Sequence, residues 1–141
     1  MALSISRAEL WAVGIEDQAG GLASKLEGLA ATGANLEFVF ARRSPEDPGK
    51  GVAFVTPLKG AKQKLGAKKL GFQPLERIGT VRVEGPDSAG LSAKITQALA
   101  EKNITLRGYS GSTIGKRVVT YLAFDSQADA IQAVRVLKKK L

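Results

Sequence analysis

Apolar and polar positions alternate and recur along this chain in an order that predicts alternating strands and helices. Large and small apolar residues alternate over residues 11–15, as in a half-buried strand, and Leu22, Leu26 and Leu29 follow at helical spacing. In the first half, strands are predicted over residues 11–15, 36–40, 52–55 and 72–78, and helices over 22–30 and 60–69. Pro74 cannot donate a ladder hydrogen bond, so the fourth strand is expected at a sheet edge.

The second half repeats this order but lacks a final strand. Its strands are predicted over residues 81–83, 106–109 and 118–124, and its helices over 91–99 and 126–139, with Asp125 or Ser126 as the cap of the last helix. The order predicts an α+β fold of two tandem ferredoxin-like βαββαβ units, each an antiparallel sheet with both helices on one face. The expected domains are residues 8–78 and residues 79–141, of which the second lacks its own fourth strand.

A missing fourth strand would leave the predicted strand 81–83 at an open sheet edge. Residues 3–5 alternate apolar and polar, and the pattern of the first unit has no place for them. We therefore expect this N-terminal segment, from the same chain or from a partner, to cover that edge.

One turn occurs twice in the chain, in the same frame and seventy positions apart. The first copy reads Asp17-x-Ala19-Gly20 and the second Asp87-x-Ala89-Gly90; eight of the twenty-six positions in 11–36 and 81–106 are identical. Unrelated sequences of ordinary composition would share about two. Asp is expected to accept amide hydrogens at the helix entrance, and Gly to allow a backbone angle or approach that a Cβ would block. Such a helix start suits a carboxylate ligand, although local chemistry alone favours a plain capped turn.

These two stretches, residues 17–36 and 87–106, resemble the ACT domain family. The family pattern runs Asp-x-Pro-Gly-x-Leu and then Leu-Ala-x-x-Gly-Ile-Asn-Ile across a strand, a helix and the next strand; this chain carries it twice, as in Leu29-Ala30 and Leu99-Ala100. ACT domains are regulatory modules that commonly bind amino acids between two domains. The resemblance implies a ligand-binding set of Asp17, Ala19, Gly20, Gly21, Asn35, Asp87, Ala89, Gly90 and Leu91.

The chain departs from the family pattern at two points. Ala19 and Ala89 stand where the family usually has Pro, and Thr105 stands in the second copy where the first has Asn35. If the ligand needs Asn, the second copy binds poorly or only completes the site of the first. Asn35 could also serve only to turn the chain from helix into strand.

Composition narrows the possible functions. The 141 residues include no His and no Cys, which excludes a Cys/His metal site, thiol chemistry and the commonest general base. We therefore expect no enzyme, no cofactor and no metal. No apolar run is long enough for a membrane span and no signal peptide is evident, so a cytoplasmic protein is expected. The expected partners are an amino acid ligand, a second copy in a homodimer, and a client enzyme or regulator.

RNA binding is the alternative function, because RNA-recognition motifs share the βαββαβ order. Residues 50–57 resemble the third-strand signature of that family, but Val52 and Pro57 stand where aromatic residues should, and the aromatic side chains are expected in the core. The net charge of +8 includes two lysine-rich stretches that are interpreted as solvated helix faces. Nucleic acid is therefore an unlikely partner.

Overall fold

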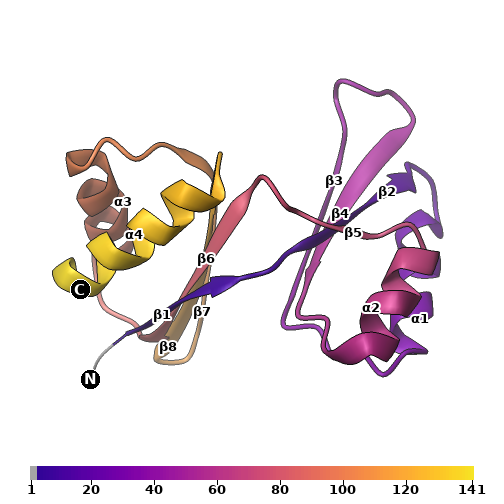
Figure 1. Cartoon of the computed structure of the whole chain (residues 1–141), viewed down its shortest axis with the longest axis horizontal. Coiled ribbons are helices and arrows are strands. Elements are labelled where there is room, and N and C mark those ends of the chain that lie inside the picture. The colour runs from indigo at the N-terminus through magenta and orange to yellow at the C-terminus, as the bar shows by residue number, and fades with distance from the viewer. Residues whose placement is uncertain (1–2) are drawn as a thin grey trace. The chain divides into compact units, whose positions relative to one another are not determined.

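The computed structural model describes residues 3–141, which form two compact units (Figure 1). Residues Glu9–Leu75 make up one unit, here called the continuous unit. The other, here called the discontinuous unit, combines the N-terminal segment up to Ala8 with Glu76–Leu141. The predicted boundaries, 8–78 and 79–141, differ from this division by a few residues, and the N-terminal segment belongs with the second half of the chain.

The continuous unit is an antiparallel sheet with both of its helices on one face (Figure 1). Its elements are β2 (Trp11–Glu16), α1 (Gly21–Ala30), β3 (Phe38–Arg43), β4 (Lys50–Thr56), α2 (Gly60–Lys69) and β5 (Gln73–Pro74). The strand order β3-β4-β2-β5 is that of a ferredoxin-like unit. Trp11, Leu29, Val55 and Phe72 are buried in its core, each at most 2% exposed. β5 is shorter than the predicted 72–78, and Pro74 lies at the sheet edge as expected.

The discontinuous unit has the same architecture, completed by the N-terminal strand. Its elements are β1 (Ser4–Ala8), β6 (Gly79–Pro86), α3 (Leu91–Glu101), β7 (Leu106–Ile114), β8 (Arg117–Phe124) and α4 (Gln127–Lys140), in strand order β1-β6-β8-β7. β1 pairs antiparallel with β6, and Ile5 lies opposite Val83. The prediction that the N-terminal segment covers this edge is therefore confirmed, and the strand comes from the same chain. Ser126, one of the two predicted caps of α4, accepts a hydrogen bond from the Asp129 amide.

The aromatic side chains of Phe40 and Phe54 lie outside the core, contrary to the expectation from sequence. Phe54 on β4 is opposite Phe40 on β3, whereas the next residue, Val55, is fully buried under the helices. Because successive strand residues point to opposite faces, Phe40 and Phe54 lie on the face away from the helices. Their ring centroids are 6.2 Å apart, and Phe40 is 45% exposed.

No helix within residues 3–141 is long and apolar enough to cross a membrane. In the same residues, no three His, Cys, Asp or Glu side chains lie close enough to hold a metal ion.

Candidate ligand-binding site

The repeated turn has the same backbone in both units. Gly20 and Gly90 are the N-cap residues of α1 and α3, with φ of 88° and 80°, in the left-handed region that favours glycine. The first intrahelical bonds run from Ser24 N to Gly20 O and from Lys94 N to Gly90 O, each 3.0 Å. The amides between these residues therefore precede the helical hydrogen bonds and carry the partial positive charge of a helix start.

The aspartates of the repeat do not cap these helices, which corrects the expectation from sequence. Within the described residues, neither α1 nor α3 has a side-chain cap. The turns are closed by main-chain bonds instead, from Gly21 N to Gln18 O (3.1 Å) and from Leu91 N to Ser88 O (3.2 Å). The positive φ of the glycine makes this closure possible, so a side-chain cap is not required.

Each Asp instead ties the turn to the neighbouring strand hairpin through its main chain. Asp17 N donates to Gly49 O at 3.0 Å, and Asp87 N donates to Lys116 O at 2.8 Å. The Asp17 carboxylate also forms an ion pair with Arg43, with Oδ2 2.8 Å from Nε. The repeated Asp therefore fixes the turn against the hairpin in both units.

In the continuous unit, a pocket of about 650 Å³ opens at the repeated turn. Ala19, Gly20 and Gly21 line it, together with residues of β2, α1 and β4. Lys50 Nζ, at its rim, donates to Glu16 Oε1 at 2.5 Å, and this hydrogen bond raises the pKa of the Lys50 ammonium.

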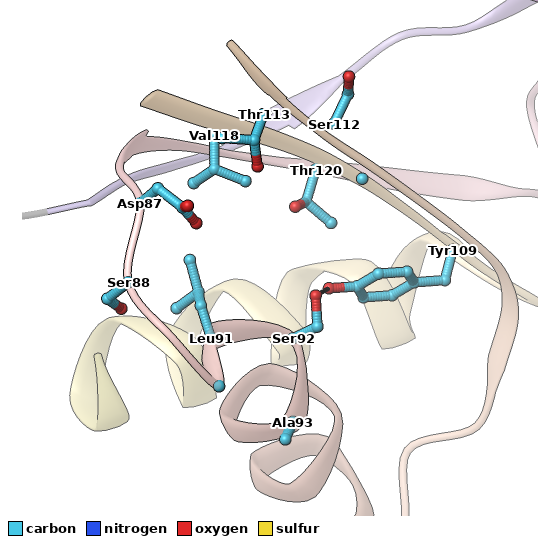
Figure 2. A pocket seen from close by; sticks show the side chains of 12 residues that line it. Asp87, Ser88, Leu91, Ser92, Ala93, Tyr109, Ser112, Thr113, Val118 and Thr120 are labelled. Atoms are coloured by element: carbon cyan, nitrogen blue, oxygen red, sulfur yellow. Dashed lines mark hydrogen bonds between the residues drawn. The ribbon is translucent and has the colours of Figure 1, made fainter. Parts of the chain in front are cut away.

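In the discontinuous unit, a pocket of about 490 Å³ opens at the equivalent turn, between α3 and the strands β7 and β8 (Figure 2). Asp87, Gly90 and Leu91 line it, as predicted residues of the ligand-binding set. The Tyr109 hydroxyl on β7 donates to Ser92 Oγ, in the first turn of α3, at 2.7 Å (Figure 2). The rest of the lining includes the hydroxyl side chains of Ser88, Thr113 and Thr120, whereas the Ser112 side chain points away from the pocket (Figure 2).

Three of the predicted site residues are not brought to either pocket lining. Asn35 is exposed in the segment between α1 and β3, and neither Asp17 nor Ala89 is among the lining residues described. The hydroxyl residues of β7 and β8 were missed by sequence reasoning. Their signal is the alternation of Tyr109, Gly111 and Thr113, which places these residues on one face of a strand.

Comparison with known proteins gives similarity in structure but not in sequence. No family profile and no curated protein sequence matches the chain. The structure of protein BT0572 from Bacteroides thetaiotaomicron superposes with a TM-score of 0.77 at 16% identity, covering 95% of this chain and 90% of that one. The ligand-free regulatory subunit of aspartate kinase from Thermus thermophilus superposes with a TM-score of 0.64 at 16% identity, covering 100% and 97%.

A third structure, the regulatory subunit of aspartate kinase from Thermus flavus, has a TM-score of 0.55 at 20% identity and covers 99% of this chain and 95% of that one. These regulatory subunits are tandem ACT domains. The chain has the tandem ACT fold. The resemblance drawn from the repeated turn is thereby confirmed at the level of fold, over essentially the full length of both chains.

In terms of the ACT fold, each pocket lies where the first strand of a unit leads into its first helix. The two turns agree in backbone, since both N-cap residues are glycines of similar positive φ. The two pockets differ in what surrounds the turn. The ion pair between Lys50 and Glu16 lies beside it in the continuous unit, and hydroxyl groups lie beside it in the discontinuous unit.

Proposed function

We propose that the chain is a regulatory protein that binds an amino acid, or a similar small carboxylate, and signals through altered assembly. The observation that carries this proposal is a pocket at the repeated turn of both ACT units. The regulatory subunits with the same fold support it. Pocket volumes of this size, about 300–1,000 Å³, are usual for small-molecule sites.

The chemistry of the turn fits a zwitterion. A carboxylate would accept from the free amides at the helix start, where the helix dipole contributes about 0.3–1 kcal/mol. An ammonium needs acceptors, and Glu16 in one pocket and Asp87 in the other supply carboxylates. We propose a binding and not a catalytic role, because the sequence offers no His or Cys to activate a nucleophile.

The output of such a sensor would be a change in assembly. We propose a homodimer in which ligand binding at an interface between ACT units favours one arrangement of the copies over another. The altered assembly would then act on a client enzyme or regulator. A ligand shifts such an equilibrium only by its difference in affinity for the two arrangements.

Calorimetry and thermal shift against the common amino acids test the proposal on the full chain. A ligand at 100 times its Kd raises the free energy of unfolding by about 2.7 kcal/mol. We expect at least one amino acid to bind with a Kd below about 1 mM, which corresponds to about −4.1 kcal/mol. If none does, the amino-acid function is wrong and the chain is better described as an interaction domain.

Three glycines provide a matched set of variants for locating the site. Gly20, Gly90 and Gly33 have φ of 88°, 80° and 87°, and a Cβ at each would meet nothing within 4 Å. Substitution by Ala therefore imposes a similar backbone strain at all three, about 1–2 kcal/mol. We expect Gly20→Ala or Gly90→Ala to weaken binding, whereas Gly33→Ala, outside the lining described for both pockets, should lower only stability.

RNA binding is a second candidate function, favoured by the Phe40–Phe54 pair, in which Phe40 is exposed. Aromatic side chains on the open face of a sheet are the platform on which RNA-recognition motifs stack bases. The central strands here offer Ala12 and Val52 on that face, where such a platform would carry further aromatic residues.

A further inference from the structure

The register of the two sheets relates each position of one ACT unit to a position of the other. In the continuous unit Ala53 lies opposite Val13, and in the discontinuous unit Thr120 lies opposite Val83. Val13 and Val83 are equivalent in the repeat, seventy positions apart. Thr120 therefore occupies the place of Ala53.

The same register shows that the pocket of the discontinuous unit is polar where the continuous unit is mostly apolar. The lining residue stands first in each equivalent pair: Thr120 and Ala53, Ser92 and Leu22, Tyr109 and Val39, Gly111 and Ala41, Thr113 and Arg43. In the continuous unit Ala53 is fully buried, and Leu22 and Ala41 pack against the core. Apolar packing therefore occupies this place in one unit, whereas in the other it is a pocket lined with hydroxyls.

Thr120 is the side chain that points most directly to a ligand. It is 1% exposed, and its hydroxyl has no hydrogen-bond partner within residues 3–141. Figure 2 shows this hydroxyl directed into the space between β8 and the start of α3. Among the described residues, the fully buried side-chain oxygen that lacks a partner is Thr80 Oγ1, whereas the Thr120 hydroxyl reaches the open space of the pocket. The Thr120 hydroxyl is therefore available to a ligand in this pocket.

Gly111 keeps the space in front of Thr120 open. A Cβ built on Gly111 would lie 3.3 Å from Thr120 Oγ1, closer than most real contacts of a Cβ. The φ of Gly111 is not in the left-handed region, so its backbone does not demand glycine. The absence of a side chain here preserves access to the hydroxyl.

The charges of the lining define the class of ligand. Among the twelve lining residues that the structure describes, Asp87 carries the only charged side chain. A ligand ammonium would pair with Asp87, and a ligand carboxylate would accept from the amides of Ser92 and Ala93 at the start of α3. An acidic side chain on the ligand would then find no cation, and a basic one would compete for the single carboxylate. The remaining hydroxyls can donate to or accept from an uncharged polar group.

We propose that the discontinuous unit holds the amino-acid site, that Thr120 selects the ligand, and that the ligand is an α-amino acid with a short, uncharged hydrogen-bonding side chain. This inference rests on the proposed sensor function and assigns it to one of the two pockets. It reverses the expectation, based on Thr105 in place of Asn35, that the second copy binds less well.

The test compares ligands and variants by calorimetry on the full chain. Serine, threonine, asparagine and glutamine are the probes, with leucine, aspartate and lysine as comparators. Thr120→Val removes the hydroxyl and keeps the shape, so affinity for the probes should fall about tenfold, while the variant without ligand melts no lower than the parent. Gly111→Ala should weaken the same probes about tenfold or more. Ser110→Ala, on the opposite face of β7, is the matched control and should change nothing.

The glycine variants separate this inference from the proposed function. Loss of binding in Gly90→Ala with normal binding in Gly20→Ala supports the assignment. The reverse result, or unchanged affinity in both Thr120→Val and Gly111→Ala, overturns it and leaves the sensor function standing. Tighter binding of aspartate or lysine than of every probe overturns the ligand class. If the parent binds no amino acid at all, the proposed function fails and this inference fails with it.

Discussion

Substitution of Ile5 by Ala tests the most consequential feature of the fold, the N-terminal strand in the sheet of the discontinuous unit. Ile5 is 8% exposed and belongs to the same apolar core as Val81, Val83 and Leu137. It lies opposite Val83 in the β1–β6 ladder. Its side chain therefore stabilises a unit whose other residues begin some seventy positions later in the chain.

The expected loss follows from the carbons removed. Ile→Ala deletes three side-chain carbons, worth about 0.8 kcal/mol each when buried, or roughly 2.4 kcal/mol. Buried Ile→Ala changes cost about 2–5 kcal/mol in total, and an edge strand can relax into part of the cavity, so we expect about 2–3 kcal/mol. For a unit of this size each kcal/mol shifts Tm by about 4–8 °C, so Tm should fall by about 10–20 °C.

Urea unfolding followed by far-UV circular dichroism measures this loss, and hydrogen exchange of the Val81 and Val83 amides locates it. Ser6→Ala is the matched control, because Ser6 is an exposed residue of the same strand and should change stability by no more than about 0.5 kcal/mol. Removal of residues 3–7 should cost more than either substitution and leave β6 with an open edge, which favours association. Equal stability of the Ile5→Ala and Ser6→Ala variants would refute the role assigned to β1.

Three further predictions concern other parts of the molecule. Ser126→Ala removes the cap of α4 and should cost about 1 kcal/mol in urea unfolding; a change below about 0.3 kcal/mol would mean that the cap is dispensable. The hydrogen bond from Arg117 lowers the pKa of Glu84 below its usual 4.5, so this pair stabilises the fold above that pH and loses its effect as the pH falls through the lowered pKa. Carboxyl titration by NMR should show the lowered pKa in the parent and its return toward 4.5 in Arg117→Ala; an unchanged value would count against the pair. Finally, any affinity for oligonucleotides should fall steeply with salt and show no base preference, and sequence-selective binding that survives about 0.3 M salt would favour the RNA-binding alternative.

Much of the fold could be predicted from sequence because its local signals agree with its tertiary structure. The helix predicted over 60–69 is α2, and the strand predicted over 11–15 is β2 with one further residue. The sequence predicts that β7 ends at Tyr109, because the Ser and Gly residues that follow are typical of turns. The strand in fact continues to Ile114. Its pairing with β8 along the whole hairpin overrides that local preference.

The candidate site could be predicted only on the side that is continuous in sequence. The repeated turn can be recognised in the sequence from Gly20 and Gly90. Their place before a helix indicates a backbone angle that favours glycine, and both have a positive φ. The opposite wall comes from β7 and β8, and its residues meet the turn only through strand register. Thr120 in particular lies in an apolar strand, where Thr is an ordinary β-forming residue and gives no sign of facing a pocket.

The discontinuous unit links its N-terminal strand to any ligand that it binds. β1 and the strands of the pocket are parts of one sheet, in the order β1-β6-β8-β7, so a ligand that requires the folded sheet also favours the docking of β1. The apparent Kd equals the intrinsic Kd divided by the fraction of molecules that are competent to bind. Weakening β1 through Ile5→Ala should therefore leave affinity unchanged in water, where nearly all molecules remain folded. The same variant should bind more weakly than the parent once urea unfolds an appreciable fraction of it. This dependence separates a ligand held by the complete sheet from one held by the turn alone.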